Sequence, residues 1–239
     1  DQGDFLNRDT IEAFVEYAEF CFQEFPEVHH WSTFNEIYPV ATNQYLLGVF
    51  PPGIQYDLSK VIQCLHNMMY AHARVVNLFK EKGYLGEIGV VHSLETKYPA
   101  TDSEENKHVA FLDDALSIRF LLDATYLGYY SNETMEALNE ICAANNASYE
   151  FLESDFEEMK KANKIRRYLE NEIYNEIEEK IQRLNRPKYI FMKSRSWHSG
   201  VVGVVCSRIS IKYNIPVILV SIKNGYGKAS CRSIEGINI

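Results

Sequence analysis

The sequence has no run of about 18 apolar residues, the length that a membrane-spanning helix requires. Its first residues, DQGDFLNRD, have neither the basic start nor the apolar stretch of a secretory signal. We therefore expect a protein with no membrane span and no secretory leader.

Cysteine is scarce and irregularly placed. The chain has 5 cysteines in 239 residues, and no two of them have the C-x-x-C spacing. An odd number of scattered cysteines argues against a disulfide framework and a zinc site, and favours a reducing compartment. These observations predict a cytoplasmic protein.

The motifs of several enzyme classes are also missing. There is no G-x-S-x-G, and the glycines of GVVGVV lack the third glycine and the ribose-binding acid of a dinucleotide fingerprint. His29 and His30 would point to opposite faces of a strand, and His66 and His72 do not have the spacing of three or four residues that brings two helical ligands together. The sequence therefore predicts no cofactor and no metal site.

A strong asymmetry of charge is present. The net charge is −9, but residues 1–163 carry 27 acidic and 10 basic side chains, whereas residues 164–239 carry 6 and 14. A basic unit tolerates phosphate backbones and an acidic unit repels them. The change of sign indicates two units with different partners, although two ordinary surfaces would produce the same totals.

Helix and strand patterns alternate along the first 94 residues. Asp9 with Glu12 predicts the capped start of a helix, and Asp57 and Gly83 predict the start and end of another. The predicted elements are a helix at 9–25, a strand at 28–36, a helix at 58–82 and a strand at 86–94. This spacing is typical of βα units and predicts a parallel sheet.

The rest of the chain is mainly helical before it returns to strands. Residues 153–184 are charged and favour a helix, with apolar residues at every fourth position from Ile165 to Ile181. The other predicted elements are a loop at 95–107, helices at 109–130, 132–146 and 200–214, strands at 187–194 and 216–221, and a glycine turn that enters a final strand.

Asn35 and Glu36 stand where the first predicted strand ends. Barrel enzymes place their catalytic groups at the carboxyl ends of parallel strands, and an amide there can bind a sugar hydroxyl. Taken alone, however, a glutamate at a strand end is more often a solvated or salt-bridged residue.

The motifs WSTFNE, QYLLGVFPPGI, HNMMYAHARVV, GEIGVV and TKYP together resemble glycoside hydrolase family 1, and within it bacterial 6-phospho-β-galactosidases, from residue 1 to about residue 160. The resemblance implies a (β/α)8 barrel that hydrolyses phosphorylated β-galactosides with retention. It also implies that Glu36 is the general acid/base and that Asn35 contacts the sugar 2-hydroxyl. Retention needs a second carboxylate roughly 5 Å away. Because the family's TENG nucleophile motif is absent, we expect little or no hydrolysis by this chain.

A second group of motifs lies near the carboxyl end. Ser199 and Gly200 precede an apolar helix whose N-terminus can bind a phosphate, and Ser230 and Arg232 supply donors beside a glycine turn. An ordinary α/β core with a glycine hairpin would account for the same residues.

The segments WHSGVVGVVCSR and GKASCRSI resemble the C-terminal, DHHA1-type module of RecJ-type single-strand exonucleases. The resemblance implies that His198, Arg208, Ser230 and Arg232 face nucleic-acid phosphates, with single-stranded DNA as the partner of residues 187–239. The Asp-His-His run that would hold two manganese ions is absent, so this part also lacks its catalytic centre.

The patterns together predict an α/β chain. A partial (β/α)8 barrel at residues 1–162 would be joined by a connector helix at residues 163–186 to a small α/β module at residues 187–239. No linker of Gly, Ser or Pro separates the two resemblances. We interpret the chain as a fusion of two incomplete pieces.

Overall fold

The computed structural model describes residues 3–184, 187–223 and 225–237, without the side chain of residue 165. The chain divides into two compact units, Asp1–Asn163 and Lys164–Ile239, which we call unit 1 and unit 2. Each unit has its own hydrophobic core. The predicted end of the connector at residue 186 lies outside the described residues.

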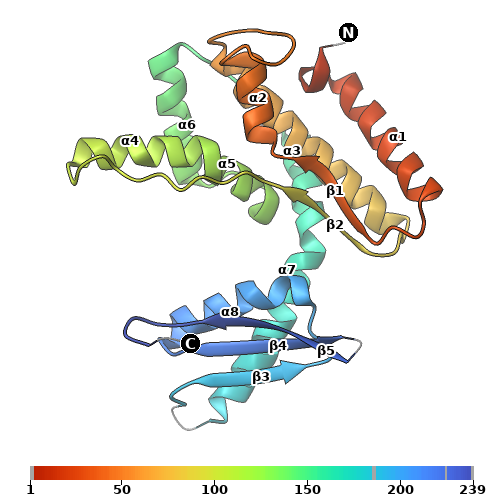
Figure 1. Ribbon diagram of the computed structural model, residues 1–239, viewed down its shortest axis with the longest axis vertical. Coiled ribbons are helices and arrows are strands. Elements are labelled where there is room, and N and C mark those ends of the chain that lie inside the picture. Colours follow the sequence, from red (N-terminus) through yellow and green to blue (C-terminus); the bar gives the residue numbers. More distant parts are fainter. Residues whose placement is uncertain (1–2, 185–186, 224, 238–239) are drawn as a thin grey trace. The chain divides into compact units, whose positions relative to one another are not determined.

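Unit 1 is built around a pair of parallel strands and the helix that connects them (Figure 1). Its elements before the helical region are η1 (Asp4–Leu6), α1 (Arg8–Glu24), β1 (His30–Asn35), α2 (Ile37–Tyr45), α3 (Leu58–Glu81) and β2 (Glu87–Val91). In the register of the two strands, His30 lies opposite Glu87 and Asn35 opposite Val91. The predicted parallel pairing is therefore confirmed.

The helical region of unit 1 follows β2. It comprises α4 (Glu104–Asp114), η2 (Ala115–Arg119), α5 (Phe120–Leu122), η3 (Asp123–Leu127), α6 (Asn132–Asn145) and the first part of α7 (Glu153–Gln182). Ser103 accepts a hydrogen bond from the backbone N–H of Asn106 (3.2 Å) and begins α4. The predicted loop at 95–107 was therefore too long, because Ser103 is an effective N-cap within it.

The two predicted helix starts had different outcomes. Asp57 caps α3 as expected, since its carboxylate accepts the backbone N–H of Lys60 (3.0 Å), and Gly83 follows the helix with φ of 70°. The predicted cap of α1 was wrong. Asn7 takes that position, and its side chain accepts the N–H of Asp9 (3.0 Å), because asparagine is as good a cap as aspartate.

Helix α2 was not predicted. Ile37, Ala41 and Tyr45 are buried at every fourth position and pack towards α3. Pro39 lies in its first turn. A proline in the first turn of a helix removes an N–H that would have no partner within the helix.

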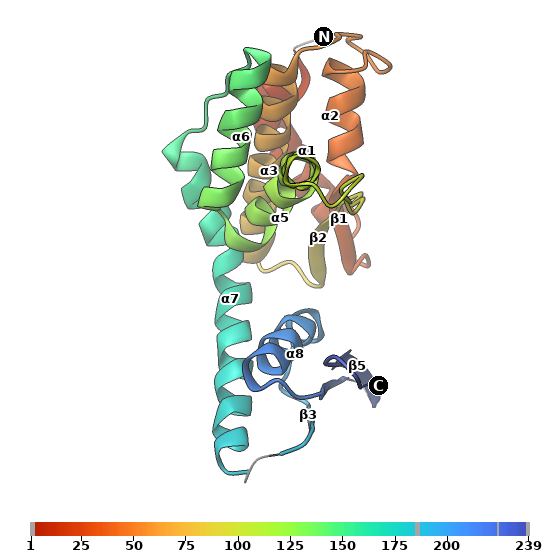
Figure 2. The same cartoon turned by 90° about the vertical axis from the view of Figure 1, so that its left-hand side faces the viewer.

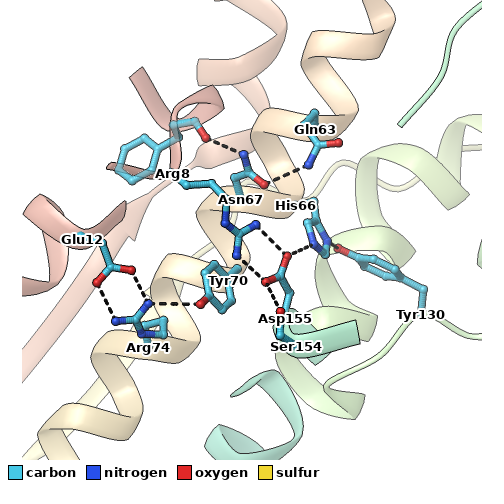
Figure 3. A network of polar contacts seen from close by, with 11 residues as sticks. Arg8, Glu12, Gln63, His66, Asn67, Tyr70, Arg74, Tyr130, Ser154 and Asp155 are labelled. Carbon is cyan, nitrogen blue, oxygen red and sulfur yellow. Dashed lines mark hydrogen bonds and ion pairs between the residues drawn. The ribbon is translucent and has the colours of Figure 1, made fainter. Parts of the chain in front are cut away.

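A buried polar network connects α1, α3 and the start of α7 (Figure 3). Asp155 has no exposed side-chain surface, and its carboxylate accepts hydrogen bonds from Arg8 (2.6 and 3.0 Å) and from His66 Nε2 (3.1 Å). Burial acts to raise the pKa of Asp155, but the bonds from His66 and Arg8 outweigh it and lower the pKa to about 2.

Within this network His66 is neutral, because burial lowers its pKa. Its Nε2–H therefore donates to Asp155, and its Nδ1 accepts from the hydroxyl of Tyr130 at 2.9 Å. Both ring nitrogens are satisfied, so this histidine is a structural residue.

Unit 2 contains the rest of α7 followed by β3 (Ile190–Ser194), α8 (Ser199–Tyr213), β4 (Val217–Lys223) and β5 (Tyr226–Arg232). Its sheet has the order β3-β4-β5, with β3 parallel and β5 antiparallel to β4. Ile173, Ile177 and Ile181 of α7 are buried in its core, so the regular apolar spacing predicted the buried face of this helix correctly.

Among the described residues, no helix combines the length and the apolar character needed to cross a bilayer.

Candidate active site

Glu36 lies in the turn that joins β1 to α2. Its backbone is left-handed (φ 55°, ψ 57°), and its N–H donates to the carbonyl of Val91 at the end of β2 (2.8 Å). The side chain is exposed and does not cap α2. The carboxylate and the exposed Asn35 beside it therefore lie at the carboxyl ends of both parallel strands.

The backbone before this pair is held by a buried hydrogen-bond bridge. Thr33 Oγ1 donates to the carbonyl of Gly89 in β2 (3.2 Å) and lies 2.8 Å from His72 Nδ1 in α3. Because the single hydroxyl proton goes to Gly89, His72 donates its Nδ1–H to Thr33. Burial lowers the pKa of His72 to about 3, which keeps it neutral. Thr33, two residues before Asn35, therefore connects β1 by hydrogen bonds to both β2 and α3.

Close to this bridge lies a second, half-buried imidazole. His92 follows β2, and its Nε2 is 2.9 Å from Thr125 Oγ1 in η3. Burial lowers its pKa, and its buried Nδ1 has no hydrogen-bond partner among the described residues. His92 connects the end of β2 to the helical region rather than to Glu36.

Asn35 and Glu36 place an amide beside an exposed carboxyl group. A carboxylic acid at this place can protonate a leaving oxygen, and the amide can bind a hydroxyl. In the part of the chain that the structure describes, no side chain is hydrogen-bonded or ion-paired to Glu36.

In unit 2, the predicted nucleic-acid residues lie in two groups. Ser230 and Arg232 lie on the same side of β5, towards α8: Arg232 Nε donates to Ser207 Oγ (2.6 Å), and a Cβ on Gly203 would lie 3.4 Å from Ser230 Oγ. His198 precedes α8, and its Nδ1 accepts the N–H of Gly200 (3.2 Å).

Arg208 lies on a different side of α8. Its guanidinium donates to Glu170 of α7 (2.7 Å) and stacks 4.3 Å above the ring of Tyr174. Positions 207 and 208 of a helix point about 100° apart, so Arg208 and the Ser207–Arg232 contact cannot share one face. The structure thus brings together Ser230 and Arg232, but it directs Arg208 to α7.

The parallel strands of unit 1, the crossover between them and the carboxylate at the strand ends are typical of the (β/α)-barrel class of proteins. The sequence model of glycosyl hydrolase family 1 matches residues 1–230, and the chain belongs to this family. It is 55% identical over 168 residues to a 6-phospho-β-galactosidase of Streptococcus mutans serotype c, covering 70% of this chain and 36% of that protein.

Solved structures also match the fold of this chain. A β-glucosidase from Exiguobacterium marinum is 27% identical with a TM-score of 0.59, covering 65% of this chain and 35% of that one. The AHE enzyme from Alicyclobacillus herbarius is 25% identical with a TM-score of 0.61, covering 67% and 36%. The chain therefore spans about a third of the length of the relatives it matches.

The family match extends further along the chain than we expected. It reaches residue 230, whereas the resemblance in the motifs ends near residue 160 and the solved structures cover 65–67% of the chain. We assign the barrel fold to unit 1 because strands of such a barrel are all parallel, whereas β4 and β5 form an antiparallel hairpin.

Proposed function

We propose that unit 1 carries the acid/base half of a retaining glycoside hydrolase that acts on 6-phospho-β-galactosides. The observation that carries this proposal is the position of Glu36, exposed at the carboxyl ends of β1 and β2 and fixed by Val91, in a chain of glycosyl hydrolase family 1. Glu36 acts as general acid/base, and Asn35 binds the sugar 2-hydroxyl.

The named substrate is supported by the S. mutans relative, which is described as a 6-phospho-β-galactosidase. We further propose that these 239 residues alone show little or no hydrolysis of such substrates, because one carboxylate cannot complete the covalent step of retention. Turnover of a chromogenic 6-phosphogalactoside by the chain alone that disappears in Glu36→Gln would contradict this second proposal.

A chimera tests the role of Glu36 directly. Residues 1–163 replace the aligned segment of the S. mutans enzyme, and hydrolysis of the chromogenic substrate is measured. We expect activity in the chimera and a loss of roughly 10²- to 10⁴-fold in kcat/KM in its Glu36→Gln variant. Glu87→Gln, at the opposite end of the strand pair, is the matched control and should retain activity. Equal rates for the two variants would refute the assignment.

The contacts in unit 2 favour a second candidate function. We propose that residues 187–239, which resemble a RecJ-type module, bind single-stranded DNA through His198, Ser230 and Arg232 along α8. The charge of this segment supports the proposal. Residues 187–239, which follow α7, contain 8 basic side chains and 1 acidic one. Arg208 is engaged by Glu170, so we propose that it stabilises the packing of α7 on α8 instead.

Binding of an oligothymidylate at several salt concentrations tests this candidate. Arg232→Ala should weaken binding and reduce the salt slope by about one unit, because one phosphate contact is lost. Arg208→Ala should leave the salt slope unchanged. Equal retention of Arg232→Ala and the parent on a single-stranded DNA column would refute the role of Arg232.

Two further points belong to this proposal. The free cysteines at all five positions support a reducing, cytoplasmic compartment.

We also propose that the chain joins pieces of two ancestries within α7. We propose that this junction is an artefact of assembly, gene prediction or recombination. One unbroken transcript across codons 160–165 would contradict an artefact.

A further inference from the structure

The backbone of Glu36 has a conformation that the surrounding structure must hold in place. Its φ of 55° lies in the left-handed region, which residues with a Cβ rarely occupy, and its N–H donates to the carbonyl of Val91 (2.8 Å). Such strained residues persist only where their neighbours fix them, and they cluster at functional sites. The group that holds Val91 is therefore part of what holds Glu36.

His92, the residue after Val91, is anchored by its side chain to the helical region. Figure 1 and Figure 2 show α5, which directly precedes η3, close to the end of β2. The hydroxyl of Thr125 in η3 donates to the carbonyl of Leu121 (2.7 Å), so its proton is not available to His92. The Nε2–H of His92 therefore donates to Thr125 Oγ1 (2.9 Å). A side-chain hydrogen bond of defined direction thus connects the end of β2 to η3.

The segment that accepts this hydrogen bond is itself fixed. η3 is a π-helical segment, a form that occurs frequently at functional sites. Its first residue, Asp123, accepts hydrogen bonds from the N–H and the hydroxyl of Ser131 (2.8 and 2.7 Å) and from the hydroxyl of Thr134 (2.7 Å). These bonds hold η3 against the start of α6, so Thr125 is a rigid support for the ring of His92.

The other ring nitrogen indicates that stability alone does not explain this histidine. Burial lowers the pKa of His92 and keeps the ring neutral, so Nδ1 is an acceptor. This buried nitrogen has no hydrogen-bond partner among the described residues, and an unsatisfied buried acceptor is destabilising. A leucine would avoid that cost and leave Thr125 bonded to Leu121. A purely structural role would therefore be filled better by an apolar side chain.

We propose that His92 is a positioning residue for Glu36, on which it acts through Val91. The ring, supported by Thr125, fixes the carbonyl that keeps Glu36 in its left-handed conformation, and so orients the carboxylate. The proposal rests on the proposed acid/base role of Glu36 only for its effect on catalysis. The effect on the backbone of Glu36 is measured separately, so the two can fail independently.

Hydrogen exchange of the full 239-residue chain, followed by NMR at single residues, tests the effect on the backbone. We expect His92→Leu to speed exchange of the Glu36 amide about three- to tenfold, because the hydrogen bond to Val91 loses its support. The amide of Glu87, which donates to His29 at the opposite end of the strand pair, is the internal control and should be unchanged. The unfolding midpoint should not fall, since the substitution removes the unpaired nitrogen.

Conservative variants separate the hydrogen bond from the bulk of the ring. His92→Gln places an amide nitrogen near the position of Nε2 and should keep the parent's exchange rate, whereas the amide nitrogen of His92→Asn corresponds to Nδ1 and should not. Thr125→Ser keeps the accepting hydroxyl and Thr125→Val removes it, with the same expected contrast. Equal exchange of the Glu36 amide in His92→Gln and His92→Leu would overturn the proposal.

The effect on catalysis is measured in the chimera that carries residues 1–163. His92→Leu should lower kcat about tenfold with little change in KM, because the acid is displaced while the substrate still binds, and His92→Gln should retain kcat. If Glu36→Gln has no effect in this chimera, the acid/base role fails and the exchange result stands. If Glu36→Gln abolishes hydrolysis but His92→Leu leaves kcat unchanged, His92 does not position the acid for the reaction.

Discussion

Asp155 is a carboxylate with no exposed side-chain surface, and its burial is compensated by two neighbours from distant parts of the sequence. Arg8 provides two hydrogen bonds and a positive charge, and His66 provides one hydrogen bond. Breaking a buried pair by removing one partner is costly, because the other is left without compensation. The network should therefore contribute more to stability than the exposed ion pairs of the same helix.

Asp155→Asn tests this difference at a single site. We expect a loss of roughly 2–4 kcal/mol in the unfolding free energy of unit 1, because the pairing with Arg8 is lost. Glu157→Gln, which removes an exposed pair with Lys160, should cost less than about 1 kcal/mol. Urea unfolding followed by tryptophan fluorescence and circular dichroism measures both variants. Similar costs would show that the buried network is not a major source of stability.

The buried histidines predict how stability depends on pH. The pKa of His72 is lowered by burial from 6.5 to about 3, so below pH 6.5 the unfolded chain binds a proton that the folded chain does not. Stability is therefore fully present above 6.5 and falls on acidification, by about 1.4 kcal/mol per pH unit until the folded pKa is reached. His66 contributes in the same direction.

Urea midpoints measured from pH 7 downwards check this expectation. His72→Asn removes the titrating ring and keeps a side-chain donor towards Thr33, so its stability curve should be flatter than that of the parent between pH 6.5 and about 4.5. Parallel curves for parent and variant would contradict the assigned role of His72.

Part of the site could be predicted from local patterns, and part could not. The aromatic and β-branched residues before Asn35 predicted a strand. The helix predicted between this strand and the next one indicated that the two strands are parallel, and Glu36 was therefore expected at their carboxyl ends. The Asp155 network joins residues 147 and 89 positions apart, and no short pattern encodes such pairs. The separation of Arg208 from Arg232 also depends on tertiary contact, here with Glu170.

At the scale of elements, the junction between β1 and the start of β2 depends on one glycine. Gly86 has φ of 117°, and a Cβ there would collide with the backbone carbonyl of His29. That carbonyl accepts the N–H of Glu87 (2.8 Å), which is the first bond of the strand pair. Only glycine combines this conformation with so close an approach.

Gly86→Ala should therefore cost roughly 2–4 kcal/mol in the stability of unit 1, since both the strained φ and the collision act on the same ladder bond. Gly89→Ala is the matched control in β2, where an added Cβ meets nothing within 4 Å, and it should change stability by less than about 1 kcal/mol. Thermal unfolding of both variants makes the comparison. Equal stability would mean that the start of β2 can move without loss.

At the scale of the whole molecule, two cores are encoded separately. The core of unit 1 gathers residues from α1, α2, α3 and the helical region, and the core of unit 2 gathers residues from α7, α8 and the sheet. Helix α7 passes through the boundary at Asn163, but its buried isoleucines from Ile173 onwards belong to unit 2 alone. The change in the sign of charge at the same point was the one feature of composition that indicated this division.

Because the cores are separate, the chain should unfold in two transitions that respond to different substitutions. Ile62→Ala and Ile177→Ala are chemically identical changes at fully buried positions, one in each core. Each should cost about 2–5 kcal/mol through lost burial and the cavity that remains.

In scanning calorimetry, we expect Ile62→Ala to lower only the transition of unit 1 and Ile177→Ala only that of unit 2. Acidification from pH 7 to about 5 should shift only the first, since the buried His66 and His72 lie in unit 1. A single transition that both variants lower equally would show that the two cores unfold cooperatively.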